Sequence, residues 1–170
     1  MNHSVRLALT GFMGVGKSSI ARHLEHMTGC PRIDLDSLVE ERAGKSIAEI
    51  IDSDGVTRFR EIEAECLSKV IEADHGCILS LGGGTWTIAA NRDLIKHSGF
   101  TSIWLESSFE HCWYNIKFSR KERPLARDKD AARKLFDERQ KVYCLADWHF
   151  LIKPGSTSYD VAIEIAEQVL

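Results

Sequence analysis

The N-terminal segment VRLALTGFMGVGKSSIARHLEHMTG constrains the fold of this chain more than any other stretch. Residues 11–18 read GFMGVGKS and fit the pattern G-x-x-x-x-G-K-[ST]. They follow an apolar run at residues 5–10, which predicts a short buried strand. They precede residues 18–27, where apolar residues recur at helical spacing, and Gly29 is a stop signal for that helix. A strand, a glycine-rich loop and a helix in this order predict a loop that surrounds phosphate groups with backbone amides.

The residue types in this loop suit a nucleoside triphosphate bound with Mg2+. Its glycines allow turns that bring several N–H groups around one anion, and the following helix points its positive end at the same place. Lys17 adds a full charge that can reach the outer phosphates, and the Ser18 hydroxyl is placed to bind the metal. The predicted nucleotide-binding residues are Gly14, Val15, Gly16, Lys17, Ser18 and Ser19.

Strand and helix patterns alternate along the rest of the chain. Further short apolar runs predict strands at residues 31–35, 77–81, 100–105 and 150–152. Helical patterns occupy residues 38–43, 47–51, 57–73, 92–97, 109–118 and 159–169. This alternation predicts an α/β protein in which helices cover both faces of a parallel sheet. The length of 170 residues and the absence of a linker-like stretch favour a single domain, 1–170.

Composition argues against several classes of partner. The 22 basic and 25 acidic residues give a net charge of -3, so no overall positive field attracts nucleic acid or an anionic membrane. No apolar run reaches the length of about 18 residues that a membrane span needs. The five cysteines show neither a C-x-x-C pair nor metal-site spacing, and we interpret them as buried thiols of a reducing cytoplasm.

Two aspartates favour transfer of the phosphate to a second molecule over its transfer to water. The guanine-reading tetrapeptide N-K-x-D of GTPase switches does not occur, and the D-x-x-G match at residues 52–55 follows a helical pattern, where a turn explains it. Asp34 and Asp36 lie two apart at the end of a predicted strand, so we expect both to point to one side of the sheet. One could hold the water shell of the metal while the other orients an acceptor hydroxyl and takes its proton. The alternative is a helix N-cap at Asp36 beside a solvated Asp34.

Two arginines and a glycine turn suggest the kind of acceptor. Arg60 lies on the predicted helix at residues 57–73, and Arg139 lies on a helix beyond a charged stretch. Each alone could be a surface ion pair. Together with an aspartate in one pocket, they would suit a small polyhydroxy carboxylate, because a guanidinium binds a carboxylate through two hydrogen bonds. The bare backbone after a strand, at Gly82, Gly83 and Gly84, could approach such a ligand closely.

The charged stretch at residues 119–131, SRKERPLARDKDA, has no clear period and contains Pro124. It could be a solvated loop, but long charged loops in nucleotide enzymes often act as lids over the bound substrates.

These motifs together resemble the shikimate kinases, a family of the nucleoside monophosphate kinase-like P-loop class. The resemblance covers essentially the whole chain and depends on six motifs in order: GFMGVGKSS, IDLDS, SIAEIIDSDGVTRFREIE, LSLGGG, RPLA and ERQKVY. It implies a three-layer α/β/α P-loop kinase fold with a five-stranded parallel sheet, a mobile lid at about 112–130 and a substrate-binding helical segment at about 36–64. It also implies a cytoplasmic monomer that uses ATP and Mg2+ to phosphorylate the 3-hydroxyl of shikimate in aromatic amino-acid biosynthesis.

The resemblance assigns a role to each matching residue. Lys17 and the loop amides would bind the ATP phosphates, Ser18 would bind Mg2+, and Asp34 would support the metal through water. Asp36 would hold the shikimate hydroxyls and act as the base. The acceptor site would be completed by Arg60 and Arg139 on the shikimate carboxylate and by the backbone of Gly82, Gly83 and Gly84. Arg123 would bind the ATP phosphates, because it would move in with the lid and neutralise charge on the transferring phosphoryl group. The implied catalytic residues are Lys17, Asp36 and Arg123.

Three positions depart from the family pattern. Val56 follows Gly55 where the family commonly has Gly-Glu. The helix before the lid reads CWYNIKF and lacks the arginine that stacks on adenine, so Lys117 or an aromatic residue is expected to replace it. Trp86 and Thr87 are bulkier than the family residues and are expected to reshape the rim of the pocket.

Two other functions are compatible with these departures. One is a kinase of another small hydroxy acid, such as a gluconate-like sugar acid. The other is a catalytically weak nucleotide-binding regulator. The retained set of Lys17, Ser18, Asp34, Asp36 and Arg123 argues against the regulator, since a protein without catalysis need not keep it.

Overall fold

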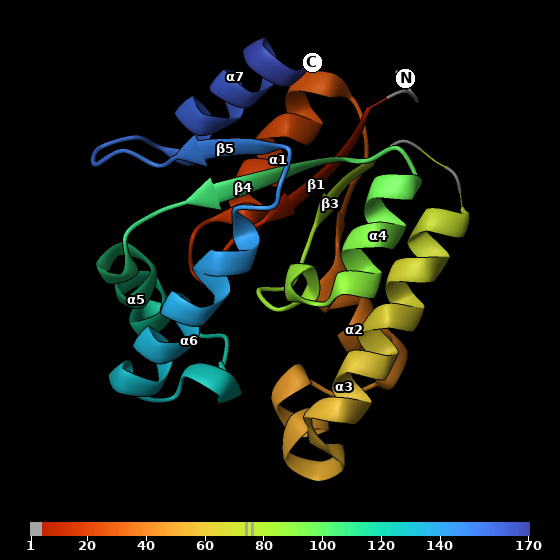
Figure 1. The fold of residues 1–170 in the computed structure, drawn as a ribbon, viewed down its shortest axis with the longest axis vertical. Helices are drawn as coiled ribbons and strands as arrows, with labels where there is room; N and C mark the ends of the chain where they lie inside the picture. Colours follow the sequence, from red (N-terminus) through yellow and green to blue (C-terminus); the bar gives the residue numbers. More distant parts are fainter. Residues whose placement is uncertain (1–4, 74, 76) are drawn as a thin grey trace.

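The computed structural model describes residues 5–73, 75 and 77–170 and contains one parallel sheet covered by helices (Figure 1). Within these residues the sheet has five strands in the order β2-β3-β1-β4-β5. The strands are β1 Arg6–Thr10, β2 Arg32–Asp34, β3 Cys77–Ser80, β4 Thr101–Glu106 and β5 Trp148–Leu151. The expected α/β/α architecture is therefore confirmed.

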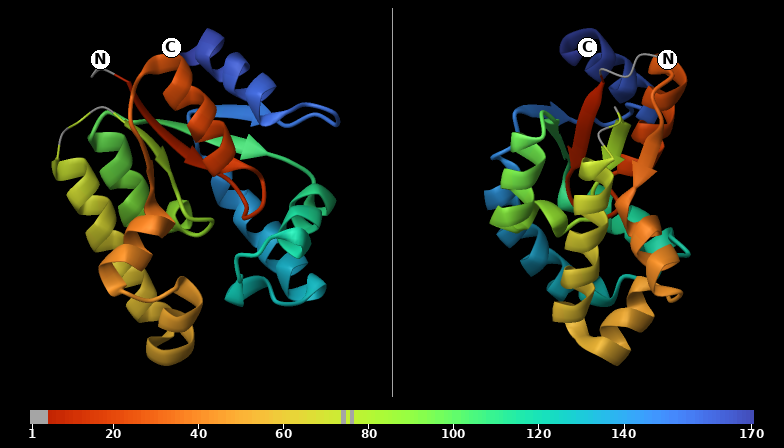
Figure 2. Two further views of the ribbon diagram at one scale, coloured as in Figure 1. Left: turned by 180° about the vertical axis from the view of Figure 1, so that it is seen from behind. Right: turned by 90° about the vertical axis from the view of Figure 1, so that its right-hand side faces the viewer.

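Each of the five described strands is followed by at least one helix. Neighbouring parallel strands need a long crossover connection, which is usually helical. They are α1 Lys17–Thr28, α2 Leu35–Ala43, α3 Ile47–Glu72, α4 Ala89–His97, α5 Phe109–Phe118, α6 Lys129–Tyr143 and α7 Ser158–Val169. The helices α1 and α7 pack against each other on one face of the sheet, and α4 lies on the opposite face beside α3 (Figure 2). Two short 3-10 helices, η1 Thr85–Thr87 and η2 Pro124–Ala126, lie in connections.

The central strands are apolar because helices cover both of their faces. Ala8 and Leu9 of β1 and Ile78 and Leu79 of β3 are fully buried. The register pairs Leu7 with Ile78, which places the carboxyl ends of β1 and β3 at the same edge of the sheet. The loops that leave this edge are the ones that carry the sequence motifs.

Gly55 divides α3 into two helical stretches, as the sequence predicts. The predicted helices at residues 47–51 and 57–73 form α3, with a break at Gly55, where φ is 87° and ψ is 165°. This backbone conformation is rarely adopted by L side chains, so the glycine permits the sharp kink at which the two helical stretches meet. Ser46 begins α3 with a reciprocal capping arrangement that includes Glu49.

The charged stretch after α5 is shorter than predicted. The Asp128 side chain accepts a hydrogen bond from the Ala131 backbone N–H at 2.9 Å and so begins α6 at Lys129, inside the expected loop at residues 119–131. Within the remaining stretch, Pro124 begins the single turn η2, consistent with the fixed φ of proline. The loop that could act as a lid is therefore partly ordered.

Trp86 does not lie at the rim of a pocket, so that expectation was wrong. Its side chain is 0% exposed, and the indole N–H donates to the Val142 carbonyl of α6 at 3.2 Å. The Thr87 hydroxyl turns back to donate to the Gly84 carbonyl at 2.6 Å. The bulky residues after the glycines therefore connect this turn to α6 and to its own backbone.

Four of the five cysteines are buried, as the sequence analysis expects. They are the cysteines at positions 30, 66, 77 and 112, whereas Cys144 is exposed. Burial raises the pKa of the Cys77 and Cys112 thiols to about 11. Among the described residues, no helix has the length and apolar character needed to cross a membrane.

We predict that Trp86→Ala lowers the free energy of unfolding by about 3–5 kcal/mol, because it leaves a cavity and removes the hydrogen bond from the indole to the Val142 carbonyl. Urea denaturation measures the change. Trp148→Ala is the matched control, since that side chain is 39% exposed, and its cost should stay below about 1 kcal/mol. Equal losses in the two variants would contradict a core role for Trp86.

Candidate functional site

The loop at residues 11–18 connects β1 to α1 at the carboxyl edge of the sheet and lines a pocket that we call the loop pocket. Gly14 has φ 80°, and a Cβ there would lie 2.6 Å from the Cys112 carbonyl oxygen of α5. Asn115 of α5 donates from Nδ2 to the Gly14 carbonyl at 2.7 Å. A side chain at position 14 would thus strain the loop and push it off α5, so the glycine allows α5 to support the loop directly.

Lys17 carries a buried positive charge at the start of α1. Its Nζ donates to the carbonyl oxygens of Gly11 at 2.7 Å and Phe12 at 3.1 Å, and the residue is 9% exposed. Burial lowers the pKa of Lys17 to about 8, and the nearby cation Arg123 adds to this effect. An anion in the loop pocket would stabilise the charged form, which matches the use of this lysine for phosphate.

Asp34 and Asp36 do not lie at the end of one strand, so the expectation that strand alternation points both to one side was wrong. The strand β2 ends at Asp34, which caps α2 by accepting the Ser37 backbone N–H at 3.2 Å, and Asp36 lies in the first turn of that helix. The N-cap is therefore Asp34 and not Asp36. The helical turn still places both residues in the lining of the loop pocket.

The Ser18 hydroxyl donates to Asp34 Oδ2 at 2.7 Å. This contact joins the end of the loop to the start of α2 and places two hard oxygen atoms beside Lys17 in the loop pocket. Ser19, the next residue, shares a hydrogen bond of 3.2 Å with the hydroxyl of Ser158 on α7.

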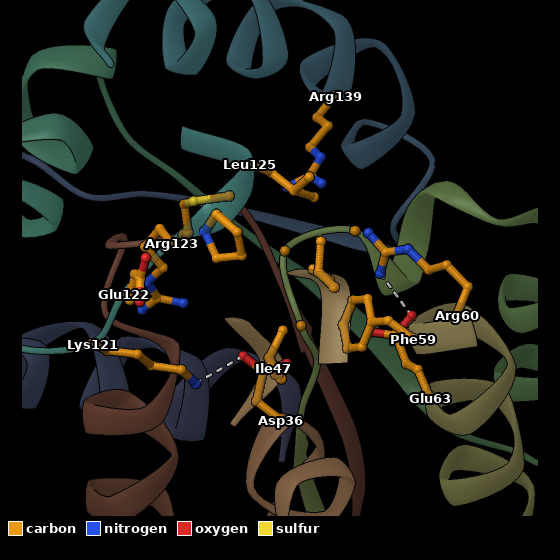
Figure 3. A pocket seen from close by; sticks show the side chains of 16 residues that line it. Asp36, Ile47, Phe59, Arg60, Glu63, Lys121, Glu122, Arg123, Leu125 and Arg139 are labelled. Carbon is orange, nitrogen blue, oxygen red and sulfur yellow. Dashed lines mark hydrogen bonds and ion pairs between the residues drawn. The ribbon is translucent and has the colours of Figure 1, made fainter. Parts of the chain in front are cut away.

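A second pocket of about 470 Å³ lies beside the loop pocket (Figure 3). We call it the arginine pocket, because Arg60 of α3, Arg123 before η2 and Arg139 of α6 all line it. Its lining also contains Asp36 and the glycines at positions 82, 83 and 84. The fold thus brings together in one pocket every residue that the sequence assigned to an acceptor.

Arg139 is 7% exposed, and its Nη1 has no hydrogen-bond partner among the described residues. Burial lowers the pKa of this guanidinium, and the Arg60 charge contributes in the same direction. The Arg123 Nε is likewise buried without a partner in the described part of the chain. Unpaired donors on buried cations are costly, so this pocket is suited to an anionic ligand that would pair with them.

Glu63 is a site residue that sequence reasoning missed. It is 0% exposed and accepts from Arg60 Nη1 at 2.8 Å and from the Thr85 hydroxyl at 2.7 Å. A Cβ at Gly84 would overlap the Arg60 guanidinium, so the glycine makes room for this ion pair. The available signal was the spacing of Arg60 and Glu63, three apart on one helix face within FREIE.

Tyr143 is a second missed residue. Its buried hydroxyl donates to the Gly83 carbonyl, and burial raises the pKa of this phenol. The residue lies one turn after Arg139 on α6. It therefore fixes the glycine turn relative to the helix that supplies the arginine.

The arginine pocket and the loop pocket share several lining residues, among them Asp36, Lys121 and Arg123. The Lys121 Nζ lies 3.1 Å from Asp36 Oδ2, a contact that the sequence analysis did not anticipate (Figure 3). A ligand in one pocket would therefore meet a ligand in the other at these three side chains.

The expected replacement for an adenine-stacking arginine is not found in the lining of the loop pocket. Tyr114 and Phe118 are exposed, with ring centroids 4.7 Å apart, and the Lys117 ammonium lies 5.9 Å from the Phe118 ring. The residues of α5 that face the loop pocket are Asn115 and Ile116. The structure thus gives no support to Lys117 or an aromatic residue in this role.

Known proteins resemble this chain over nearly its full length. The family model described as shikimate kinase matches residues 13–170. A shikimate kinase from Caulobacter vibrioides is 37% identical over 163 residues, which cover 93% of this chain and 78% of that protein. A shikimate kinase from Acinetobacter baumannii, solved in complex with shikimate, has a TM-score of 0.90 and 26% identity over 98% of this chain and 94% of its own. The enzyme from Aquifex aeolicus has a TM-score of 0.81 and 31% identity, with 96% and 95% of the two chains covered.

We predict that the affinity for a non-hydrolysable ATP analogue falls about tenfold between pH 7 and pH 9. The pKa of Lys17 is about 8, so the ammonium is present at pH 7, whereas at pH 9 phosphate binding must first restore its proton. Calorimetry in two buffers of different ionisation enthalpy measures both the affinity and the proton uptake.

Lys17→Met is the control for this titration. It should bind the analogue weakly at both pH values and take up no proton. Equal affinities of the original protein at pH 7 and pH 9 would contradict a titrating lysine in the loop pocket.

Proposed function

The chain belongs to the shikimate kinase family, and on that premise we propose which of its residues carry out ATP-dependent phosphorylation of the shikimate 3-hydroxyl. The loop pocket holds ATP and the arginine pocket holds shikimate. The observation that carries this assignment is the buried Arg139 guanidinium, whose Nη1 has no hydrogen-bond partner among the described residues and which lines the same pocket as Asp36. A small acid with hydroxyl groups satisfies both.

On the donor side, the loop amides of residues 14–19 and Lys17 bind the phosphates of ATP. The amides stand at the N-terminus of α1, where the helix dipole favours negative charge. The γ-phosphate displaces the two carbonyls that Lys17 now contacts and keeps the lysine charged. This pairing offsets the cost of the buried ammonium.

The residues at the end of the loop fit Mg2+. The ion prefers oxygen ligands and keeps several waters, and the Ser18 hydroxyl and Asp34 carboxylate are two oxygen ligands that already lie 2.7 Å apart. Ser18 would bind it directly, and Asp34 would do so through water. Held there, Mg2+ would supply positive charge beside the phosphates of ATP.

On the acceptor side, Arg60 and Arg139 clamp the shikimate carboxylate. Both guanidinium groups line the arginine pocket, and Glu63 holds Arg60 in place from behind. The backbone of residues 82–84 lines the same pocket and lies close to the bound shikimate. Because a guanidinium has its donors in a rigid fork, this clamp orients the ring and with it the 3-hydroxyl.

Asp36 accepts the proton of the 3-hydroxyl while the hydroxyl oxygen attacks the γ-phosphorus. The bond from phosphorus to the bridging oxygen of ADP breaks, and ADP leaves with the electron pair. Arg123 neutralises the charge on the transferring phosphoryl group, since it lines both pockets. Positioning and charge neutralisation supply most of the rate enhancement.

The domain organisation belongs to the same proposal. Residues 1–170 act as a single domain, with a lid at about 112–130 and a substrate-binding helical segment at about 36–64. The Arg127 guanidinium donates at 3.0 Å to both oxygens of Asp52, so the lid already contacts that segment. By analogy with the family, the protein acts as a cytoplasmic monomer, to which the four buried cysteines are suited.

The two other functions are not favoured. A gluconate-like acid would also need a carboxylate clamp, but the family match and the similarity to shikimate kinases extend over nearly the whole chain. A weak regulator would not need Lys17, Asp36 and Arg123 near the place where the two pockets meet. A coupled assay of ADP release distinguishes the three, because shikimate kinase activity requires shikimate, a sugar-acid kinase responds to gluconate, and a regulator binds ATP without turnover.

We predict that Asp36→Asn lowers kcat by about 10²- to 10⁴-fold, because the amide cannot take the proton of the acceptor hydroxyl. The coupled assay measures turnover, and calorimetry with the ATP analogue checks that the loop pocket is intact. Full turnover in this variant would remove Asp36 as the base.

We predict that Arg139→Met raises the KM for shikimate by about 10- to 100-fold, because hydrogen bonds between charged groups are lost. Methyl shikimate, which lacks the anionic carboxylate, should not distinguish the variant from the original enzyme. Arg133→Met on the same helix is the matched control, since its exposed side chain pairs with Asp137 outside both pockets. A similar KM in all three proteins would contradict the clamp.

A further inference from the structure

Lys121 forms an ion pair with Asp36 at the place where the two pockets share lining residues. The lysine lies in the segment between α5 and η2, and Asp36 lies on α2, 85 positions away in sequence. Their atoms Nζ and Oδ2 are 3.1 Å apart, and Figure 3 shows the Lys121 side chain extended toward the carboxylate. The contact therefore joins the lid to the proposed base.

The two oxygens of Asp36 have different neighbours. Oδ1 lies 2.7 Å from the point where a Cβ at Gly82 would stand, so the glycine turn confines it. Oδ2 is the oxygen that accepts from Lys121. The carboxylate is thus held between the turn after β3 and the lid, and only 17% of its side chain is exposed.

Two further contacts place Lys121 in this position. The Lys121 backbone N–H donates to the Ser119 hydroxyl at 3.1 Å, which turns the segment just after α5. On the far side of η2, Arg127 binds Asp52 of α3. The lid is therefore attached to the helical segment at two separate aspartates, and Asp36 is the one that lines both pockets.

We propose that Lys121 is a positioning residue that acts through Asp36, coupling the closed position of the lid to the orientation of the carboxylate that accepts the hydroxyl proton. The proposal rests on the role assigned to Asp36 above. Its ammonium holds Oδ2 toward the boundary where the phosphoryl group passes, and the same contact holds the lid over the arginine pocket. A single ion pair with a solvent-accessible lysine is worth little, so the coupling is modest: the closed lid is favoured about two- to fivefold.

Hydrogen exchange of the backbone amides at residues 119–127, in the protein without substrates, tests the coupling. Lys121→Met and Asp36→Ala should each speed this exchange about two- to fivefold, and the double variant should be no faster than the faster single one. Arg120→Met is the matched control, because it removes a neighbouring lid cation that is exposed and lines neither pocket. Exchange in Lys121→Met equal to that of Arg120→Met, or additive effects in the double variant, overturns the coupling.

Steady-state kinetics tests the positioning role. Lys121→Met should lower kcat about two- to fivefold with a smaller effect on the KM for ATP, and Lys121→Arg should restore kcat because it keeps the charge. An unchanged kcat in Lys121→Met, or no rescue by Lys121→Arg, overturns it. Because the exchange measurement uses no substrate, it tests the Lys121–Asp36 contact in the same way even if shikimate proves not to be the acceptor.

Discussion

Positive charge buried without a matching anion is the constraint on which the site depends. Lys17 and Arg139 are each more than nine-tenths buried, and burial lowers the pKa of both. Folding such cations into a protein is costly, and here the cost is only partly offset by two loop carbonyls for Lys17. Binding of an anionic ligand recovers this free-energy cost. The same feature therefore explains why the loop pocket suits phosphate and why the arginine pocket suits a carboxylate.

Sheet topology determines that these two cations serve neighbouring pockets. The order β2-β3-β1 places the carboxyl ends of three strands at one edge. Asp34 and Asp36, the glycine turn, and the phosphate loop lie there. Buried packing then fixes each part: Trp86 and Tyr143 connect the glycine turn to α6, and Asn115 connects α5 to the phosphate loop. The ATP site and the shikimate site are adjacent because the segments that follow β1, β2 and β3 converge at this edge of the sheet.

Much of the fold could be predicted because its signals are local. The predicted strands overlap all five observed ones, and α5 was predicted with its observed bounds, since burial on both faces and helical spacing leave clear patterns. The errors arose where a local pattern has two solutions. Asp34 and Asp36 follow an extended run and could continue it, but the Asp34 side chain caps α2, so the chain turns helical one residue later. Gly55, by contrast, does interrupt the helical backbone, as the two predicted helices on either side of it require.

The sequence by itself determined the chemistry of the site: a phosphate loop, two aspartates, two arginines, a glycine turn and a charged lid, each with a local signature. Tertiary structure alone decided the contacts between distant segments. The contact of Thr85 with Glu63, Trp86 inside the core, and Lys121 on Asp36 depend on side chains that approach only after the elements pack. The physical reason is range, because backbone propensity acts over a few residues, whereas burial and charge pairing act between any segments that the fold brings together.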